Sequence, residues 1–345
     1  MFRDAAAAAG LDVKSYENPA RGPDGEPLTI DAARAGPADA ARVVVVNSAT
    51  HGAEGFCGSG IQVGWLRNRR DRDLPSGVAV LLIHGFNAYG FAWLRRVNED
   101  NIDLNRNFID HDAPYPPNDE YAELADALLP ADWDGPAHEA AEKRIADYAA
   151  ANGEQALLRA ARGQYAFPDG LFFGGNGPAW SHRALAAIAG EHLATATDIA
   201  FVDLHTGLGP YGVGEALCYH PPGTDAHDRV VAWYSQPVTV PHTGDAVSTV
   251  IDGKVGYGLQ RFLPNALVAS VTLEFGTYPL RVSMDAIRAD GWLHLRGDPA
   301  SEAGRRIKRR MRDAFYPDKD DWKSMIWSRG DQIITQAVGG LGGLG

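Results

Sequence analysis

The sequence contains little cysteine and no long apolar segment, and both shortages exclude classes of protein. Cys57 and Cys218 are its only cysteines, which is too few for the disulfide framework of a small secreted domain. The longest apolar runs, Val43–Val46 and Val78–Ile83, have the length of strands and are far too short to cross a bilayer. The first residues also lack the apolar stretch of a signal peptide. We therefore expect a cytoplasmic protein without a membrane partner.

Basic residues are scarce relative to acidic ones: 32 lysines and arginines stand against 44 aspartates and glutamates, a net charge of −12. Nucleic acids are bound mainly through their phosphates by clustered positive charge, so we expect no nucleic-acid partner. The length of 345 residues is sufficient for one large core, and the chain has no internal repeat. We predict a single catalytic domain over residues 1–345, with its core at about 40–315 and a flexible, glycine-rich tail at about 339–345.

What the sequence does contain is an alternation of apolar β-branched runs with helical segments. A strand, a helix and a second strand at this spacing predict a right-handed parallel crossover, so the expected fold class is α/β. The ends of parallel strands are where such sheets bind ligands. Strands are predicted over 43–46, 77–84, 199–204 and 268–273, helices over 58–70, 137–161 (broken near 152–153), 183–195 and 303–315, and a long surface excursion over 110–134.

Side chains with metal-ligand character follow these strands. His51 and Glu54, three residues apart after the first strand, can reach one ion, and His205 leaves the end of a later strand. Two histidines, one carboxylate and an open fourth position form a catalytic zinc arrangement. Asp203, two residues before His205, shares its side of the strand and could fix its imidazole. Taken alone, an HxxE pair or a strand-end histidine is more often a structural residue, so only the combination indicates zinc.

The stretch RVNEDNIDLNRNF, residues 96–108, collects basic and amide side chains without the apolar period of a helix or strand. Arg106 can hold a carboxylate through two parallel hydrogen bonds, and Asn105 can add a third. Arg96 could stabilise the oxyanion that forms when water attacks a carbonyl. A solvated polar loop is the competing interpretation of this stretch.

Glu274 ends the apolar strand VASVTL. A carboxylate at such a position is expected to be either ion-paired or functional. As a general base it would take a proton from metal-activated water and pass it to the leaving nitrogen, and a structural salt bridge is the alternative. With one Zn²⁺ per chain, these residues predict a zinc-dependent hydrolase that cleaves an amide or peptide bond next to a carboxylate.

The motifs HGAE, RVNEDNIDLNRNF, DLH and LEFG together resemble the motif series of the zinc carboxypeptidase family, the M14 metallopeptidases, over roughly residues 43–278. They also resemble an uncharacterised bacterial subgroup of that family. The resemblance implies a three-layer α/β/α sandwich around a mixed, mostly parallel sheet. It also implies the zinc ligands His51, Glu54 and His205, the base Glu274, the carboxylate-binding residues Asn105 and Arg106, and Arg96 at the scissile carbonyl.

Two features depart from the digestive carboxypeptidases. Ala53 stands where their HxRE motif has arginine, and it resembles instead the HGNE-type loop of the aspartoacylase and succinylglutamate desuccinylase branch. For the mobile, substrate-binding tyrosine of carboxypeptidases we predict Tyr257, because the glycines of its GKVGYG segment permit loop movement. Tyr211 is a rival, and an ordinary half-buried tyrosine is the competing interpretation of both.

The expected substrates are small peptides or N-acyl amino acids, which leaves two enzymes open: a metallocarboxypeptidase, or an aspartoacylase-like deacylase on the same fold. A non-catalytic binding protein with a relic metal site would lack a ligand or the base, and neither is missing. A serine hydrolase, suggested by the strand end at His84-Gly85, would need a G-x-S-x-G elbow, which the sequence does not contain. Nothing in the sequence indicates an oligomeric state.

Overall fold

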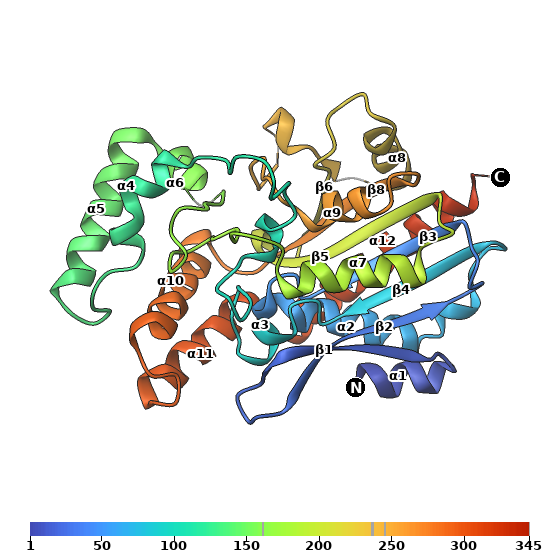
Figure 1. Cartoon of the computed structure of the whole chain (residues 1–345), viewed down its shortest axis with the longest axis horizontal. Coiled ribbons are helices and arrows are strands. Elements are labelled where there is room, and N and C mark those ends of the chain that lie inside the picture. Colours follow the sequence, from blue (N-terminus) through green and yellow to red (C-terminus); the bar gives the residue numbers. More distant parts are fainter. Residues whose placement is uncertain (161, 236–237, 245, 345) are drawn as a thin grey trace.

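A mixed eight-stranded sheet forms the centre of the protein, and helices cover both of its faces (Figure 1). The computed structural model describes residues 1–160, 162–235, 238–244 and 246–344. The strand order is β1-β2-β4-β3-β5-β8-β6-β7. The strands are β1 (Val13–Arg21), β2 (Pro27–Ala35), β3 (Arg42–Ser48), β4 (Val78–His84), β5 (Asp198–Tyr211), β6 (Gly214–Leu217), β7 (Val238–Thr239) and β8 (Leu267–Gly276).

The centre of the sheet is parallel. Strand β3 pairs in parallel with β4 and β5, and β5 pairs in parallel with β8. The β1–β2 hairpin adds to β4 in antiparallel fashion, and β6 adds to β8 in the same way. The side chains of Val43–Val46 are fully buried, as expected for strands covered on both faces. The predicted α/β class with a mixed sheet is confirmed.

The helices form two outer layers and a lateral group. Helices α1, α2, α8 and α12 share one core cluster with the sheet, and α7 and α9 share another on the opposite face, so the three-layer arrangement is present. Helices α4, α5, α6, α10 and α11 lie to one side of the sheet (Figure 1). The helices are α1 (Phe2–Ala9), α2 (Gly55–Arg67), α3 (Ala88–Ala92), α4 (Asp119–Leu128), α5 (Pro136–Asn152), α6 (Glu154–Ala160), α7 (Trp180–His192), α8 (Asp225–Trp233), α9 (Val255–Phe262), α10 (Leu280–Arg296), α11 (Glu302–Phe315) and α12 (Asp320–Gly342).

The C-terminal residues differ from the prediction. Helix α12 continues through Gly342, although a flexible tail was expected from residue 339, and Gly345 lies outside the described residues. Leu341 is fully buried, and a Cβ added to Gly340 would lie 2.4 Å from the ring of Trp233. Packing against the rest of the protein therefore overrides the low helix propensity of glycine.

The predicted limits of the core and of one loop also need correction. The sheet begins at Val13, so a core starting near residue 40 omits the β1–β2 hairpin. The excursion over 110–134 contains helix α4. The predicted break near residue 153 is confirmed, because Gly153, with φ of +82°, separates α5 from α6. Residue 161, the predicted end of that helical region, lies outside the described residues.

The two cysteines, Cys57 and Cys218, are both buried and both free thiols. Burial raises the pKa of the Cys57 thiol well above its usual range, and it raises the pKa of Cys218 to about 11. Across the part of the chain that the structure describes, no helix combines the length and the apolar character needed to span a membrane.

Candidate metal centre and active site

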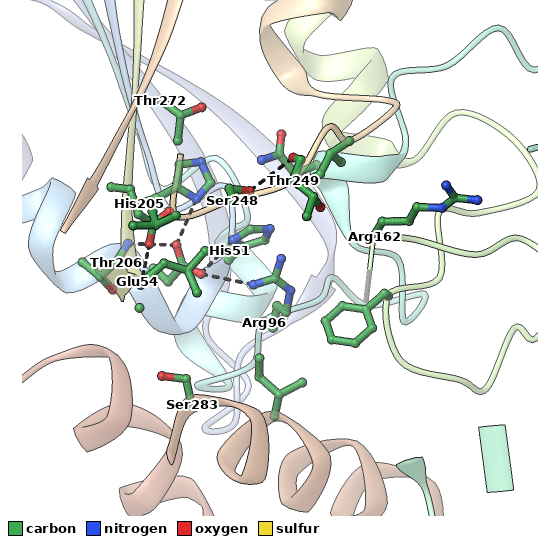
Figure 2. Close-up of a pocket in the computed structure, with 18 of the residues that line it drawn as sticks. His51, Glu54, Arg96, Arg162, His205, Thr206, Ser248, Thr249, Thr272 and Ser283 are labelled. Carbon is green, nitrogen blue, oxygen red and sulfur yellow. Dashed lines mark hydrogen bonds and ion pairs between the residues drawn. The ribbon is translucent and has the colours of Figure 1, made fainter. Parts of the chain in front are cut away.

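The loop after β3 places His51 next to Glu54. Gly52 starts a 3₁₀ turn directly after His51, and a Cβ there would lie only 1.9 Å from the backbone of Gly90. Only glycine fits this close approach. Strand β5 supplies His205, and the candidate ligand atoms of the three side chains all lie within 4.8 Å of one another. The structure thus brings the three predicted zinc ligands together, buried and turned toward one point (Figure 2).

A buried aspartate lies behind each histidine. His205 Nε2 is 2.8 Å from Asp203 Oδ2, and His51 Nε2 is 3.1 Å from Asp103 Oδ1. Because a carboxylate accepts hydrogen bonds, each Nε2 carries the hydrogen. Both rings therefore direct Nδ1 toward Glu54, at 2.7 Å from His51 and 3.0 Å from His205. The sequence predicted this role for Asp203; Asp103, inside the DLNR motif, was not recognised.

The charges around Glu54 favour a cation where the ligand atoms converge. Burial opposes ionisation of Glu54, but His51 and His205 outweigh it and lower the pKa of that carboxyl. Burial also opposes protonation of His205, and the neighbouring Asp203 outweighs it and raises the pKa of the imidazole to about 10. A bound metal ion would supply the positive charge at this point.

Glu274, on strand β8, lies beside the three candidate ligands. The parallel register sets it opposite His205, and the Leu208 backbone N–H donates to its Oε1 at 3.0 Å. Burial and the nearby Glu54 carboxylate raise the pKa of Glu274 to about 7. His205 and Lys254 favour the charged form of this carboxyl, but burial and Glu54 outweigh them. A carboxyl group with a pKa near neutral is suited to accept a proton during a reaction.

Asp103 also contacts both predicted arginines, Arg96 for the scissile carbonyl and Arg106 for the substrate carboxylate. Arg96 Nε donates to Asp103 Oδ2 at 2.9 Å, and Arg106 Nη1 lies 3.8 Å from Asp103 Oδ1. The side-chain oxygen of Asn105 accepts from the Val255 backbone N–H at 3.2 Å. The amide nitrogen of Asn105 is therefore the group that can donate to a substrate. These contacts place the loop beside the ligands.

One cavity of about 120 Å³ adjoins the site. It is lined by the predicted residues His51, Glu54, Arg96, Asn105, Arg106, His205 and Glu274. Tyr257 is not among the described residues that line it; its hydroxyl donates to the Tyr219 carbonyl at 2.7 Å. The rival Tyr211 is exposed, with its hydroxyl 3.2 Å from Asp321.

Two further residues of the cavity were not identified from the sequence. Lys254 and Tyr219 both line it, and Lys254 Nζ lies 3.9 Å from the centre of the Tyr219 ring. The sequence signal for Lys254 is its place in the GKVGYG segment, from which the sequence predicts Tyr257. Tyr219 follows a short strand and carries no motif that would have marked it.

The donor set fits a zinc ion. Two imidazole nitrogens and one carboxylate are the protein ligands of a catalytic zinc site, and they leave a position for water or substrate. The aspartates behind the two histidines supply the hydrogen-bond partners that such ligands require. The three residues therefore fit a zinc ion in their number, in their chemical type and in the hydrogen bonds that orient the two imidazole rings.

The family model described as Protein of unknown function (DUF2817) matches residues 1–329. The comparison with curated proteins gave no match. Among solved structures, the chain is similar to carboxypeptidase A from Helicoverpa armigera, at 14% identity and a TM-score of 0.46, over 91% of this chain and 71% of that one.

Two similar structures belong to other enzymes. An aspartoacylase family protein from Mesorhizobium loti matches at 11% identity and a TM-score of 0.40, over 83% of this chain and 67% of that one. The succinylglutamate desuccinylase from Chromobacterium violaceum matches at 15% identity and a TM-score of 0.37, over 92% and 74%. Each is a similarity of fold at low sequence identity.

Proposed function

The chain belongs to the DUF2817 family of proteins of unknown function, and we propose that it is a zinc-dependent hydrolase that cleaves an amide or peptide bond next to a carboxylate. The observation that carries the proposal is the convergence of His51, Glu54 and His205 in a cavity that also holds Glu274 and Arg106. Metal ligands, a proton acceptor and a carboxylate anchor are the three parts that such a reaction needs.

The residues that would hold the ion are His51, Glu54 and His205. Zinc bound there would polarise the scissile carbonyl and lower the pKa of a water molecule to about 7. Glu274 takes the proton of the attacking water and delivers it to the leaving nitrogen, because its pKa near 7 permits both transfers. Arg96 donates to the oxygen of the attacked carbonyl, where negative charge develops.

The leaving half of the substrate is held through its carboxylate. Arg106 is buried in the cavity wall, and a planar guanidinium can donate two parallel hydrogen bonds to a carboxylate. Asn105, the preceding residue, adds a donor. This contact fixes the scissile bond relative to the ligands and to Glu274.

An N-acyl amino acid deacylase is the second candidate. Ala53, between the two ligands of the HGAE motif, is completely buried and brings no charge into the site. Digestive carboxypeptidases have an arginine at the corresponding position of their HxRE motif. A site without that cation suits a short acyl group in place of a peptide chain.

Metal analysis of the purified protein tests the proposal. Elemental mass spectrometry should find about one zinc per chain in the unmodified protein, and His205→Ala should lose it. Zinc-loaded protein should then hydrolyse dipeptides or N-acyl amino acids. Protein prepared without chelator that contains no tightly bound metal would favour the binding protein with a relic site.

A further inference from the structure

Lys254 is a buried cation that the proposed mechanism does not use. Its side chain is 6% exposed and lines the same cavity as Arg106 and Glu274. Among the described residues, its Nζ forms no hydrogen bond and no ion pair. Its recorded contact is with the face of the Tyr219 ring, 3.9 Å from Nζ. A ring face attracts the charge but accepts none of the ammonium hydrogens in the way an oxygen does.

The backbone fixes Lys254 beside the carboxylate anchor. Gly253 O accepts from the Phe108 N–H at 3.0 Å, and the Val255 N–H donates to Asn105 Oδ1 at 3.2 Å. Gly253 has φ of +75°, and a Cβ there would lie 2.3 Å from the backbone oxygen of Arg106. Glycine therefore permits a close approach that sets Lys254 next to the loop carrying Asn105 and Arg106.

A buried ammonium group without an acceptor is costly, because it has lost its hydration. Burial lowers the pKa of Lys254 to about 8, with Asp203 opposing the shift and Arg106 adding to it. The group is therefore mostly charged at neutral pH. Buried cations are normally compensated by an anion. Asp203, Glu274 and Asp103 lie near enough to favour the charged form, but among the described residues none of them forms an ion pair with Lys254, which faces the open cavity.

A small second cavity of about 10 Å³ adjoins Lys254. Tyr219 and Thr272 line it as well as the main cavity, and Ser270 adds a hydroxyl. The space is about that of a single water molecule, so a substrate carboxylate would bind Lys254 from the main cavity. Tyr257 belongs to this second cavity and not to the main one.

We propose that Lys254 binds a second carboxylate of the substrate, so that the amino acid released by the hydrolase carries an acidic side chain. Arg106 would hold the main-chain carboxylate and Lys254 the side-chain carboxylate of the same leaving group. This inference rests on the proposed function for its orientation, since it takes the Arg106 end of the cavity as the leaving-group end. The substrate class is therefore an N-acyl or peptidyl aspartate or glutamate.

The test compares pairs of substrates whose side chains have nearly the same shape but differ in charge, a carboxylate against an amide. Zinc-loaded protein is assayed with Ala-Glu against Ala-Gln and with N-acetylglutamate against N-acetylglutamine. We expect kcat/KM to favour the acidic member by roughly 10- to 100-fold, the range of a hydrogen bond to a charged group. Lys254→Met should remove the preference, mainly through KM for the acidic substrate. Lys143→Met, a surface lysine on α5, is the matched control and should keep it.

A binding measurement separates this inference from the proposed function. Calorimetry on Glu274→Gln protein should show tighter binding of N-acetylglutamate than of N-acetylglutamine, and Lys254→Gln in the same background should abolish the difference. Equal kcat/KM values for the acidic and neutral substrates would overturn the role of Lys254 and leave the hydrolase intact. Absence of any turnover, with selective binding of the acidic ligand, would overturn the hydrolase and leave the anion site intact. Absence of selectivity in both assays overturns the anion site.

Discussion

Asp103 and Asp203 determine which ring nitrogen His51 and His205 offer to the centre of the site. Each carboxylate occupies Nε2, so Nδ1 faces Glu54 in both rings. Asn47 and Thr50 in turn donate to Asp203 at 2.9 and 2.7 Å. Two ligand rings are thus oriented before any ion binds, which lowers the ordering cost of metal binding.

Asp203→Asn should weaken zinc binding by about 10- to 100-fold, because an amide holds the His205 ring less firmly and does not compensate its charge. Competition with a fluorescent chelator measures the affinity. Asp198→Asn is the matched control, since Asp198 is the first residue of the same strand and pairs with Arg229. Equal zinc affinity in the two variants would contradict the orienting role of Asp203.

Glu274→Gln should reduce kcat/KM by about 10²- to 10⁴-fold while the zinc content stays near one per chain, the range expected for loss of a general base. The amide keeps the shape of the side chain but cannot take up a proton. Single-substrate assays paired with elemental analysis of the same preparation check this. Hydrolysis at the rate of the unmodified protein would rule out Glu274 as the base.

The pKa of Glu274 also predicts how activity depends on pH. The base must be ionised, and its pKa is raised to about 7 by burial and by Glu54, so kcat/KM should rise with pH and level off above neutral. A bound cation stabilises the carboxylate, which places the midpoint at or below pH 7. A kcat/KM profile over about pH 5 to 9 shows it. Activity that falls steadily across this range would contradict the assignment.

At the scale of elements, the sheet register assembles the site. Parallel pairing of β5 with β8 sets His205 opposite Glu274, and the turn after β3 adds His51 and Glu54. The sequence predicted these strands because each contains a short, mostly apolar run rich in β-branched residues. Both β5 and β8 extend past the predicted strand ends, so His205 and Glu274 lie within strands and not just after them.

The contact between the segment before α9 and the Arg106 loop gives a prediction about one glycine. Gly253→Ala should lower the melting temperature and raise KM, because its Cβ would meet the Arg106 backbone at 2.3 Å. Gly10→Ala is the matched control: its φ of +77° brings the same backbone strain, but nothing lies within 4 Å. The backbone strain alone costs about 1 kcal/mol. Melting temperatures and KM values of both variants separate the effect of backbone strain from that of the steric clash. Equal changes in the two variants would contradict the contact with the Arg106 backbone.

Other elements could not be predicted from local sequence. The glycine-rich end of α12 has the composition of a flexible tail, and its helix depends on the burial of Leu341 and the contact of Gly340 with Trp233. Lys254 and Tyr219 lie far apart in sequence and meet only through the packing of α9 against the sheet. Such contacts between distant residues leave no periodicity or motif.

At the scale of the whole molecule, the fold keeps several buried histidines in the neutral form. Burial lowers the pKa of His84, His182 and His220 to about 4, and that of His294 to about 3. The ring of His182 stacks on Phe108 with 4.4 Å between the ring centres. Unfolding frees these side chains to bind protons below their ordinary pKa of about 6.5.

Folding stability should therefore decline as the pH falls from about 6.5 toward 4, because the unfolded state binds more protons than the folded state in this window. We expect the melting temperature to drop by at least about 5 °C between pH 7.5 and 5. His182→Gln should show a smaller drop, since one titrating group is removed. Differential scanning calorimetry checks both, and a melting temperature that rises on acidification would contradict the argument.

The burial of Cys57 and Cys218 has a practical consequence for optical experiments. Thiol reagents attack the thiolate, and both thiols are buried with raised pKa values. In the folded protein these two thiols should therefore react very slowly with maleimide dyes and contribute almost no background labelling. Val250 is 41% exposed, while its neighbours Thr249 and Ile251 line the cavity. A fluorophore attached to a cysteine introduced at position 250 would lie outside the cavity. Its fluorescence should change when a ligand binds inside, so binding could be followed in real time.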